Sequence, residues 1–193
     1  AVALVAVPSP AAAVALLEAA QQALSADLTA FELMSDTCLA LVEKHVPTAR
    51  FPLATRSPWY VLIEVSDAHD EAHANGAMEA LLGQAMENEW VSDAALSSSL
   101  SQFQALWALR EDISEAQGAE GKTIKHDIAL PAALIPPFVT AASDAVTRTA
   151  PGTRVAWFGH LGDGNLHFNL SPAADRLGAE HAAAFVALEA PLN

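Results

Sequence analysis

Along the 193-residue chain, short apolar runs typical of β-strands alternate with segments whose apolar residues have the spacing of an α-helix. Three short apolar runs predict buried β-strands: VALVAV (2–7), LTAFELM (28–34) and WYVLIEVS (59–66). Alanine- and leucine-rich stretches with helical spacing follow each run and predict three helices: 10–24, 36–44 and 69–87. Ser9 and Pro10 supply an N-cap and a first-turn proline for the first helix. The first half of the chain is therefore predicted to alternate strand and helix.

The second half combines the same two patterns in a different order. A helix is predicted over residues 94–117, and another begins at Pro131 and runs to about Thr149. Three more strands are expected: KTIKHDIAL (122–130), VAWFGH (155–160) and NLHFNL (165–170). Short connections favour one α+β domain, with a largely antiparallel sheet and helices packed on one face. A parallel doubly wound sheet is the alternative.

Composition limits the partners of the chain. Hydrophobic residues make up 52% and charged residues 17%, and the formal net charge of −14 gives a surface that repels nucleic acid and anionic membranes. The N-terminal AVALVAVPSP has no basic residue and breaks at Pro8, so it predicts neither a signal peptide nor a transmembrane segment. The single cysteine, Cys38, is expected to be buried and fits a reducing compartment, so we expect a cytoplasmic location.

The segment WFGHLGDGNLHFNL (157–170) places His160 and His167 on either side of a glycine-rich turn. Seven positions apart on one straight strand, the two side chains would face opposite ways, so they converge only if the chain reverses between them. Gly162 and Gly164 permit that reversal because glycine adopts positive φ at little cost. Beyond the turn, alternation predicts a polar face with Asn165, His167 and Asn169 and an apolar face with Leu166, Phe168 and Leu170.

Two imidazoles brought together suit a divalent metal such as zinc or manganese. A complete site needs a third ligand, and Asp163 is a poor candidate because a turn aspartate commonly bonds its own backbone. A glycine hairpin without a metal is the alternative, and spacing alone favours it. His69 and His73 in HDEAH also have helical spacing, but the run departs from the HExxH pattern and predicts an acidic helix start.

Only nine lysines and arginines are present, so their settings matter. Arg110 lies within the helical run ALWALRED, and Ser114 follows one turn later on the same side. Alternation along KTIKHDIAL places Lys125 on one face with Thr123 and Asp127. An arginine and a lysine placed in this way can bind a carboxylate together. Ordinary surface ion pairs are the alternative, and the residues alone favour it.

Five segments in this order resemble the C-terminal cap domain of FAD-linked oxidases: FELMS, PWYVLIEVS, LWALREDISEA, KHDIALP and GHLGDGNLHFN. That family includes D-2-hydroxyglutarate dehydrogenases, D-lactate dehydrogenases and the FAD subunit of glycolate oxidase. The resemblance covers nearly the whole chain and implies that residues 1–193 are one cap domain of ferredoxin-like type. It is specific for the family and only weakly specific for the substrate.

The resemblance also implies a function for individual residues. In this family an N-terminal domain binds FAD, while the cap domain covers the flavin and holds a small 2-hydroxy acid, whose α-hydrogen passes to the flavin as hydride. A divalent metal, zinc or manganese, polarises the substrate hydroxyl and carboxylate. The residues implied fall into two groups: the metal ligands His160 and His167, and the substrate-binding residues Arg110, Ser114, Lys125 and Asn169.

By the same resemblance, parts of the catalytic site are expected beyond both ends of the chain. A glycine-rich flavin-binding segment would precede residue 1, and a Ser-Ala-Glu-His-Gly segment with the third metal ligand and the catalytic histidine would follow residue 193. Glu180 and His181 look similar but lack the glycines that should follow, so they are interpreted as helix-start residues.

We therefore expect no catalytic residue within the 193 residues and no activity from this chain alone. The expected partners are the flavin domain of the same protein and a small 2-hydroxy acid, and a homodimer is one assembly that the sequence permits. A metal- or carboxylate-binding module without redox chemistry is the alternative. A third hypothesis keeps the family fold with altered chemistry, because a fold does not fix a function.

Overall fold

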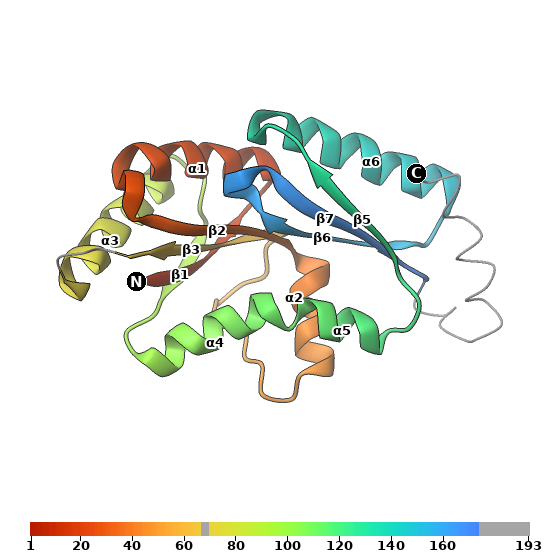
Figure 1. Cartoon of the computed structure of the whole chain (residues 1–193), viewed down its shortest axis with the longest axis horizontal. Helices are drawn as coiled ribbons and strands as arrows, with labels where there is room; N and C mark the ends of the chain where they lie inside the picture. Colours follow the sequence, from red (N-terminus) through yellow and green to blue (C-terminus); the bar gives the residue numbers. More distant parts are fainter. Residues whose placement is uncertain (67–69, 174–193) are drawn as a thin grey trace.

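The computed structural model describes residues 1–66 and 70–173. Within these ranges seven strands form one sheet in the order β4-β1-β3-β2-β6-β7-β5, and neighbouring strands are antiparallel throughout (Figure 1). The strands are β1 (Val2–Val7), β2 (Leu28–Ser35), β3 (Trp59–Val65), β4 (Asp93–Leu96), β5 (Ile124–Ala129), β6 (Arg154–His160) and β7 (Asn165–Ser171). The predicted α+β class is confirmed, and the parallel doubly wound alternative is wrong.

Helices cover both faces of the sheet, so the expectation that they pack on one face is wrong. The upper layer in Figure 1 holds α1 (Pro10–Leu24), α3 (Glu71–Glu87) and α6 (Ile135–Thr149). The lower layer holds α2 (Asp36–His45), α4 (Leu100–Glu111) and α5 (Ile113–Ala119). Two helix layers are needed because all six residues of β1 are buried, which leaves an apolar surface on each side of the sheet. The described ranges also contain three short 3-10 helices: η1 (Ser25–Asp27), η2 (Ala132–Leu134) and η3 (Leu161–Asp163).

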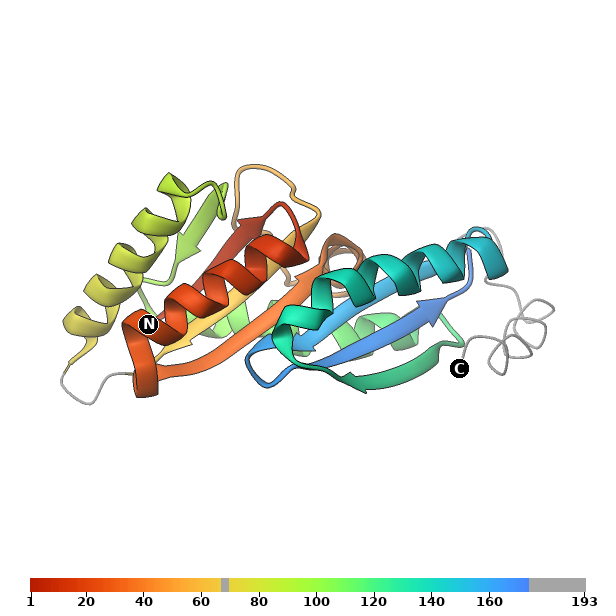
Figure 2. The same cartoon turned by 90° about the horizontal axis from the view of Figure 1, so that it is seen from above.

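The sheet consists of two units that meet at a short junction. Strands β4-β1-β3-β2, with α1 after β1 and α3 after β3, form a ferredoxin-like arrangement, as the family resemblance implied. Strands β6-β7-β5 and the helix α6 form the second unit (Figure 2). Between the units, β2 and β6 pair at only three positions, where Glu32, Leu33 and Met34 lie opposite His160, Gly159 and Phe158.

The single helix expected over residues 94–117 is wrong, because this stretch contains a strand and two helices. Asp93–Leu96 forms the edge strand β4, which pairs with β1. Alanine favours a helix, but the free edge of β1 offers backbone hydrogen bonds that a strand satisfies. Ser99 then starts α4 as an N-cap that accepts a hydrogen bond from the amide of Gln102, and Asp112 separates α4 from α5.

Two glycines shape the hairpin between β6 and β7, and only one of them was predicted. Gly164 has a left-handed φ of +68°, and a Cβ there would overlap the carbonyl oxygen of Leu130. Gly159 has a φ of +145°, and its Cβ would lie 2.6 Å from the carbonyl oxygen of Asn165. Gly162 is not among the positive-φ glycines, so its predicted role in the reversal is wrong. In the part of the chain that the structure describes, no helix is long and apolar enough to cross a bilayer.

Candidate functional site

One face of the second sheet unit carries most of the candidate residues side by side. Three cross-strand pairs lie along it: Lys125 with Asn169, Asp127 with His167, and Phe158 with His167. Residues that are directly opposite in an antiparallel pair point to the same face, so the predicted polar face of β7 is confirmed. Leu166, Phe168 and Leu170 enter the apolar core on the opposite side of the sheet.

His160 and His167 share this face as diagonal neighbours, because Asn165 is the residue directly opposite His160. Each ring is bonded through Nδ1 to a carboxylate: His160 to Glu32, and His167 to Asp127 at 2.5 Å. Neither Nε2 atom has a hydrogen bond among the described residues. A carboxylate on one ring nitrogen orients the imidazole and leaves the other nitrogen for a ligand, which is the usual environment of metal-binding histidines.

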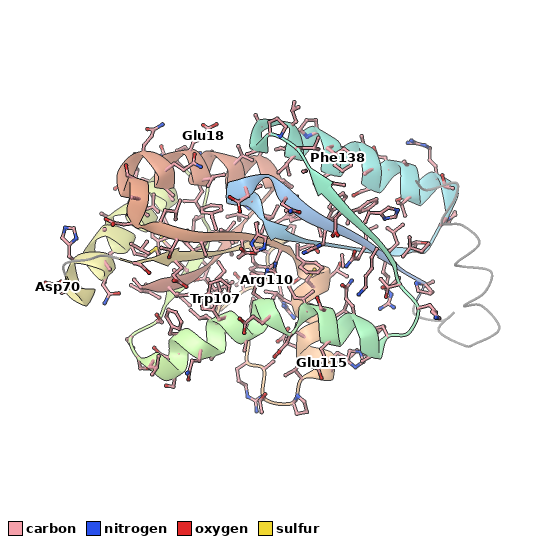
Figure 3. All side chains as sticks on the ribbon, viewed as in Figure 1. Glu18, Asp70, Trp107, Arg110, Glu115 and Phe138 are labelled. Carbon is pink, nitrogen blue, oxygen red and sulfur yellow. The ribbon has the colours of Figure 1, made fainter. Side chains whose placement is uncertain are left out.

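Arg110 comes from the last turn of α4 and reaches the same place. Its Nε donates a hydrogen bond of 2.8 Å to Glu32, and its Cζ lies 5.0 Å from the centroid of the Phe158 ring. The Phe158 ring in turn lies 4.7 Å from the ring of His167. Figure 3 shows Arg110 and Trp107 directed from α4 toward the sheet. Arg110 is therefore in an ion pair, but its side chain is only 12% exposed, unlike an ordinary surface pair.

Sequence reasoning missed Glu32, which links the histidine and the arginine. Its side chain is only 3% exposed, and its two oxygens bind His160 and Arg110 separately. A buried carboxylate is rare unless it is paired, so the lone charge inside the apolar run LTAFELM was a signal that could have pointed to it.

Lys125 and Asn169 lie opposite each other but in different surroundings. Lys125 is exposed and has no ion pair among the residues described. Asn169 is buried between the sheet and α5, where its Nδ2 donates a hydrogen bond of 2.9 Å to Gln117. The buried Asn169 Oδ1 and Gln117 Nε2 have no partner among the described residues. Gln117 was not predicted, because nothing local distinguishes it from a surface glutamine.

Ser114 does not join the other candidates. Arg110 lies in the last turn of α4 and Ser114 near the start of α5, so the predicted continuous helix is interrupted at Asp112 between the two residues. Ser114 is exposed, and its side chain has no hydrogen bond within the described ranges.

A cavity of about 390 Å³ adjoins His160 at the end of the sheet junction. Its walls include Glu32, Trp107, His160 and Asp163, together with the start of β2 and the end of α1. The volume falls within the range of sites for small molecules. The cavity thus gives a small ligand room beside the imidazole and the buried carboxylate.

His160 and His167 do not form a complete metal site with the other described residues. No group of three or more His, Cys, Asp or Glu side chains in residues 1–66 and 70–173 is arranged to hold a metal ion. Asp70 accepts a hydrogen bond of 2.7 Å from the amide of His73, as expected for an acidic helix start. His69, Glu180 and His181 lie outside the described residues.

A second buried carboxylate lies away from these candidates. Glu120 binds Lys44 at 2.5 Å, Arg154 at 2.7 Å, and His45. Burial opposes its ionisation, but hydrogen bonds from these three side chains outweigh burial and lower the pKa of Glu120 to about 2. Cys38 is buried as predicted, and burial raises the pKa of its thiol to about 11. Cys38 lies within α2, and Glu120 binds Lys44 and His45 at the end of that helix.

Comparisons with known proteins agree on one family. The model of the family described as FAD linked oxidases, C-terminal domain, matches residues 1–188. A D-2-hydroxyglutarate dehydrogenase of Stutzerimonas stutzeri is 40% identical over 146 residues, which cover 75% of this chain and 30% of that protein. The mitochondrial D-2-hydroxyglutarate dehydrogenase of Arabidopsis thaliana is 35% identical over 158 residues, covering 82% of this chain and 28% of that protein.

The chain spans less than a third of the length of these curated relatives. A solved alkyldihydroxyacetonephosphate synthase matches 100% of this chain and 40% of its own, with a TM-score of 0.58 at 12% identity, which shows a shared fold. Because the Arabidopsis relative is named as mitochondrial, the expected cytoplasmic location stays a prediction.

Proposed function

Because the chain belongs to the C-terminal domain family of FAD-linked oxidases, we propose that it is the substrate-binding cap domain of an FAD-dependent dehydrogenase for a small D-2-hydroxy acid. The observation that carries this proposal is the single sheet face on which two oriented histidines lie beside the guanidinium of Arg110. The names of the relatives support the substrate class. The flavin belongs to a separate domain of the same protein and accepts the hydride when it is bound.

Arg110 and Lys125 are the proposed carboxylate-binding residues. The Nε of Arg110 already donates a hydrogen bond to Glu32. The two terminal nitrogens of the guanidinium are therefore left for a bidentate interaction with the carboxylate of a substrate. Lys125, exposed and without an ion pair in the described part of the chain, supplies a second positive charge on the same face. In a chain of net charge −14, two such cations on one face give an anionic substrate a defined place to bind. Asn169 and Ser114 stay proposed substrate contacts.

His160 and His167 fit a divalent metal as a pair of ligands through Nε2, since each Nδ1 is already held by a carboxylate. A bound zinc or manganese ion would supply a Lewis acid for the substrate hydroxyl and carboxylate. We place the third protein ligand and the catalytic base outside the described residues. The 193-residue chain alone is accordingly proposed to be inactive.

The test uses the flavoprotein that contains this chain, purified with its FAD. Anaerobic mixing with D-2-hydroxyglutarate, D-lactate or glycolate should bleach the flavin with at least one of them. R110M and K125M should each raise KM about 10- to 100-fold, as expected for the loss of a charged hydrogen bond. K122M, which removes an exposed lysine near the start of β5, is the matched control and should leave KM unchanged. Failure of all three acids to reduce the flavin would overturn the proposal.

The alternative, a metal- or carboxylate-binding module without redox chemistry, predicts a different result. It requires tight, stoichiometric zinc binding that H160A/H167A abolishes, together with no flavin reduction by any of the three acids in the whole protein. Calorimetric titration of the wild type and the double variant with zinc, set beside the flavin assay, therefore separates the two functions.

A further inference from the structure

We propose that Glu32 is a positioning residue that sets the tautomer of His160 and the orientation of Arg110 at the same time. One carboxylate oxygen binds Nδ1 of His160, and the other accepts a hydrogen bond of 2.8 Å from Nε of Arg110. A single buried side chain thus joins the proposed metal-binding group and the proposed carboxylate-binding group. The consequences for catalysis rest on the proposed function, whereas the tautomer can be measured independently of it.

The fold gives Glu32 this position through the short junction between the two sheet units. Glu32 on β2 lies directly opposite His160 on β6, at one end of the three paired positions. Arg110 reaches the same carboxylate from α4 on the lower face. With its side chain only 3% exposed, Glu32 has little access to water that could replace either partner. Both hydrogen bonds therefore depend on the carboxylate itself.

The two partners place different demands on Glu32. The Nε of Arg110 can only donate, so it always requires an acceptor. The Nδ1 of a neutral imidazole can either donate or accept. A carboxylate has only acceptors, so His160 carries its proton on Nδ1 and keeps the lone pair of Nε2 free. That lone pair is what a metal ion or a proton in the site requires.

An isosteric amide at position 32 should reverse this tautomer. In E32Q the Nε of Arg110 donates to the single amide oxygen of the glutamine, because Arg110 cannot accept a hydrogen bond from the amide nitrogen. The amide nitrogen then faces Nδ1 of His160 and donates to it. The proton of the neutral imidazole must then lie on Nε2. A protonated Nε2 has no free lone pair and cannot bind a metal ion. A change of one atom in Glu32 would therefore disable a different residue without removing it.

The second histidine supplies a matched control. Asp127, the partner of His167, is 77% exposed and has no second donor that claims one of its oxygens among the described residues. In D127N the amide can rotate to keep its oxygen on Nδ1, and water can replace it. The tautomer of His167 should consequently stay unchanged, although the chemical substitution is the same.

The experiment measures the imidazole nitrogen NMR signals of the FAD-containing protein after removal of metal with a chelator, at a pH where the histidines are neutral. In the wild type, His160 and His167 should both carry their proton on Nδ1. D127N should leave the proton of His167 on Nδ1, whereas E32Q should move the proton of His160 to Nε2. The double variant E32Q/R110M should restore the wild-type tautomer, because the amide oxygen is then free for His160. Zinc affinity should fall about 10- to 100-fold in E32Q, as for other lost partners of metal-binding histidines, and should recover in part in E32D.

An unchanged His160 tautomer in E32Q, or a reversed one that E32Q/R110M does not restore, would overturn the proposal. In the kinetic assay E32Q should lower kcat more than it raises KM, since Arg110 keeps its acceptor. If no 2-hydroxy acid reduces the wild-type flavin, the proposed function fails, and the tautomer and zinc measurements still decide the role of Glu32. If E32Q does not fold, E32D should keep the Nδ1 proton, and a reversed tautomer in E32D would contradict the proposal.

Discussion

The two histidine–carboxylate pairs have the same chemistry and opposite surroundings. The carboxylate of Glu32 is 3% exposed and shared with Arg110, whereas the carboxylate of Asp127 is 77% exposed and binds His167 alone among the described residues. In the first pair the fold shields from water a carboxylate that needs both of its partners. In the second pair water can take the place of either partner. Two hydrogen bonds of the same chemical type can thus contribute very different amounts to the stability of the fold.

The pairs also connect different parts of the sheet. Glu32 and His160 join the ferredoxin-like unit to the second unit at the junction of β2 and β6. His167 and Asp127 lie within the second unit, on β7 and the edge strand β5. Changes to the first pair should therefore affect the whole sheet, and changes to the second pair should stay local.

The largest effect should come from a change that disturbs both pairs at once, in the hairpin that carries both histidines. G164A places a methyl group against the carbonyl of Leu130 at a φ of +68°. Backbone strain and overpacking together should lower the free energy of unfolding by on the order of 4 kcal/mol. Urea unfolding measures this loss. G162A is the control, because its Cβ would meet only Phe31 at 3.8 Å, and an equal loss in G162A would contradict the assignment.

The next effect separates the buried cation from the exposed one. R110M leaves the buried carboxylate of Glu32 with His160 as its remaining partner, so the free energy of unfolding should fall by about 3 kcal/mol. K125M removes a charge of the same sign from the exposed face and should change stability by less than about 0.5 kcal/mol. Both variants are expected to weaken substrate binding. Equal stability of the two variants would show that Glu32 does not depend on Arg110.

A third carboxylate extends the comparison to pH. Burial opposes the ionisation of Glu120, but hydrogen bonds from Lys44, His45 and Arg154 lower its pKa to about 2, below the usual value near 4.5. Its contribution to stability is therefore complete above about pH 4.5. It is lost as the pH falls from there toward 2, and the loss amounts to about 2 kcal/mol by pH 3.

Urea unfolding of the wild type and E120Q across this range isolates the effect from that of the other carboxylates. E120Q should be less stable at neutral pH, and its difference from the wild type should shrink on acidification. A difference that stays constant down to pH 3 would show that Glu120 is not held ionised by Lys44, His45 and Arg154.

What could be predicted from the sequence is the part that depends on neighbours along the chain. The alternation of polar and apolar residues predicted the two faces of β7. The glycine-rich run predicted the chain reversal that brings His160 and His167 to one face. The roles of individual glycines could not be assigned in the same way. Gly159 needs its positive φ because the returning backbone lies against it, and only the paired strands reveal that contact.

The remaining features depend on partners that are distant in sequence. Glu32 lies 78 positions from Arg110 and 128 positions from His160, so no local pattern links the three. The edge strand β4 was predicted as helix, because its alanines favour a helix and its strand pairing exists only beside β1. The same holds for the helix layers, since burial on both faces of β1 becomes visible only in the assembled sheet.

The smallest effect should come from the exposed pair. D127N removes the charge that faces His167, and the free energy of unfolding should fall by at most about 1 kcal/mol, because an exposed pair gains little over its hydration. High salt should reduce even this difference, since it screens exposed charges. Urea unfolding in low and high salt tests both points, with D144N, an exposed aspartate of α6, as the control for the loss of one negative charge. If D127N lowers the free energy of unfolding by more than about 2 kcal/mol and the loss persists in high salt, the contrast between the two pairs is wrong. Asp127 would then behave like the buried Glu32, because only a carboxylate shielded from water resists screening by salt in that way.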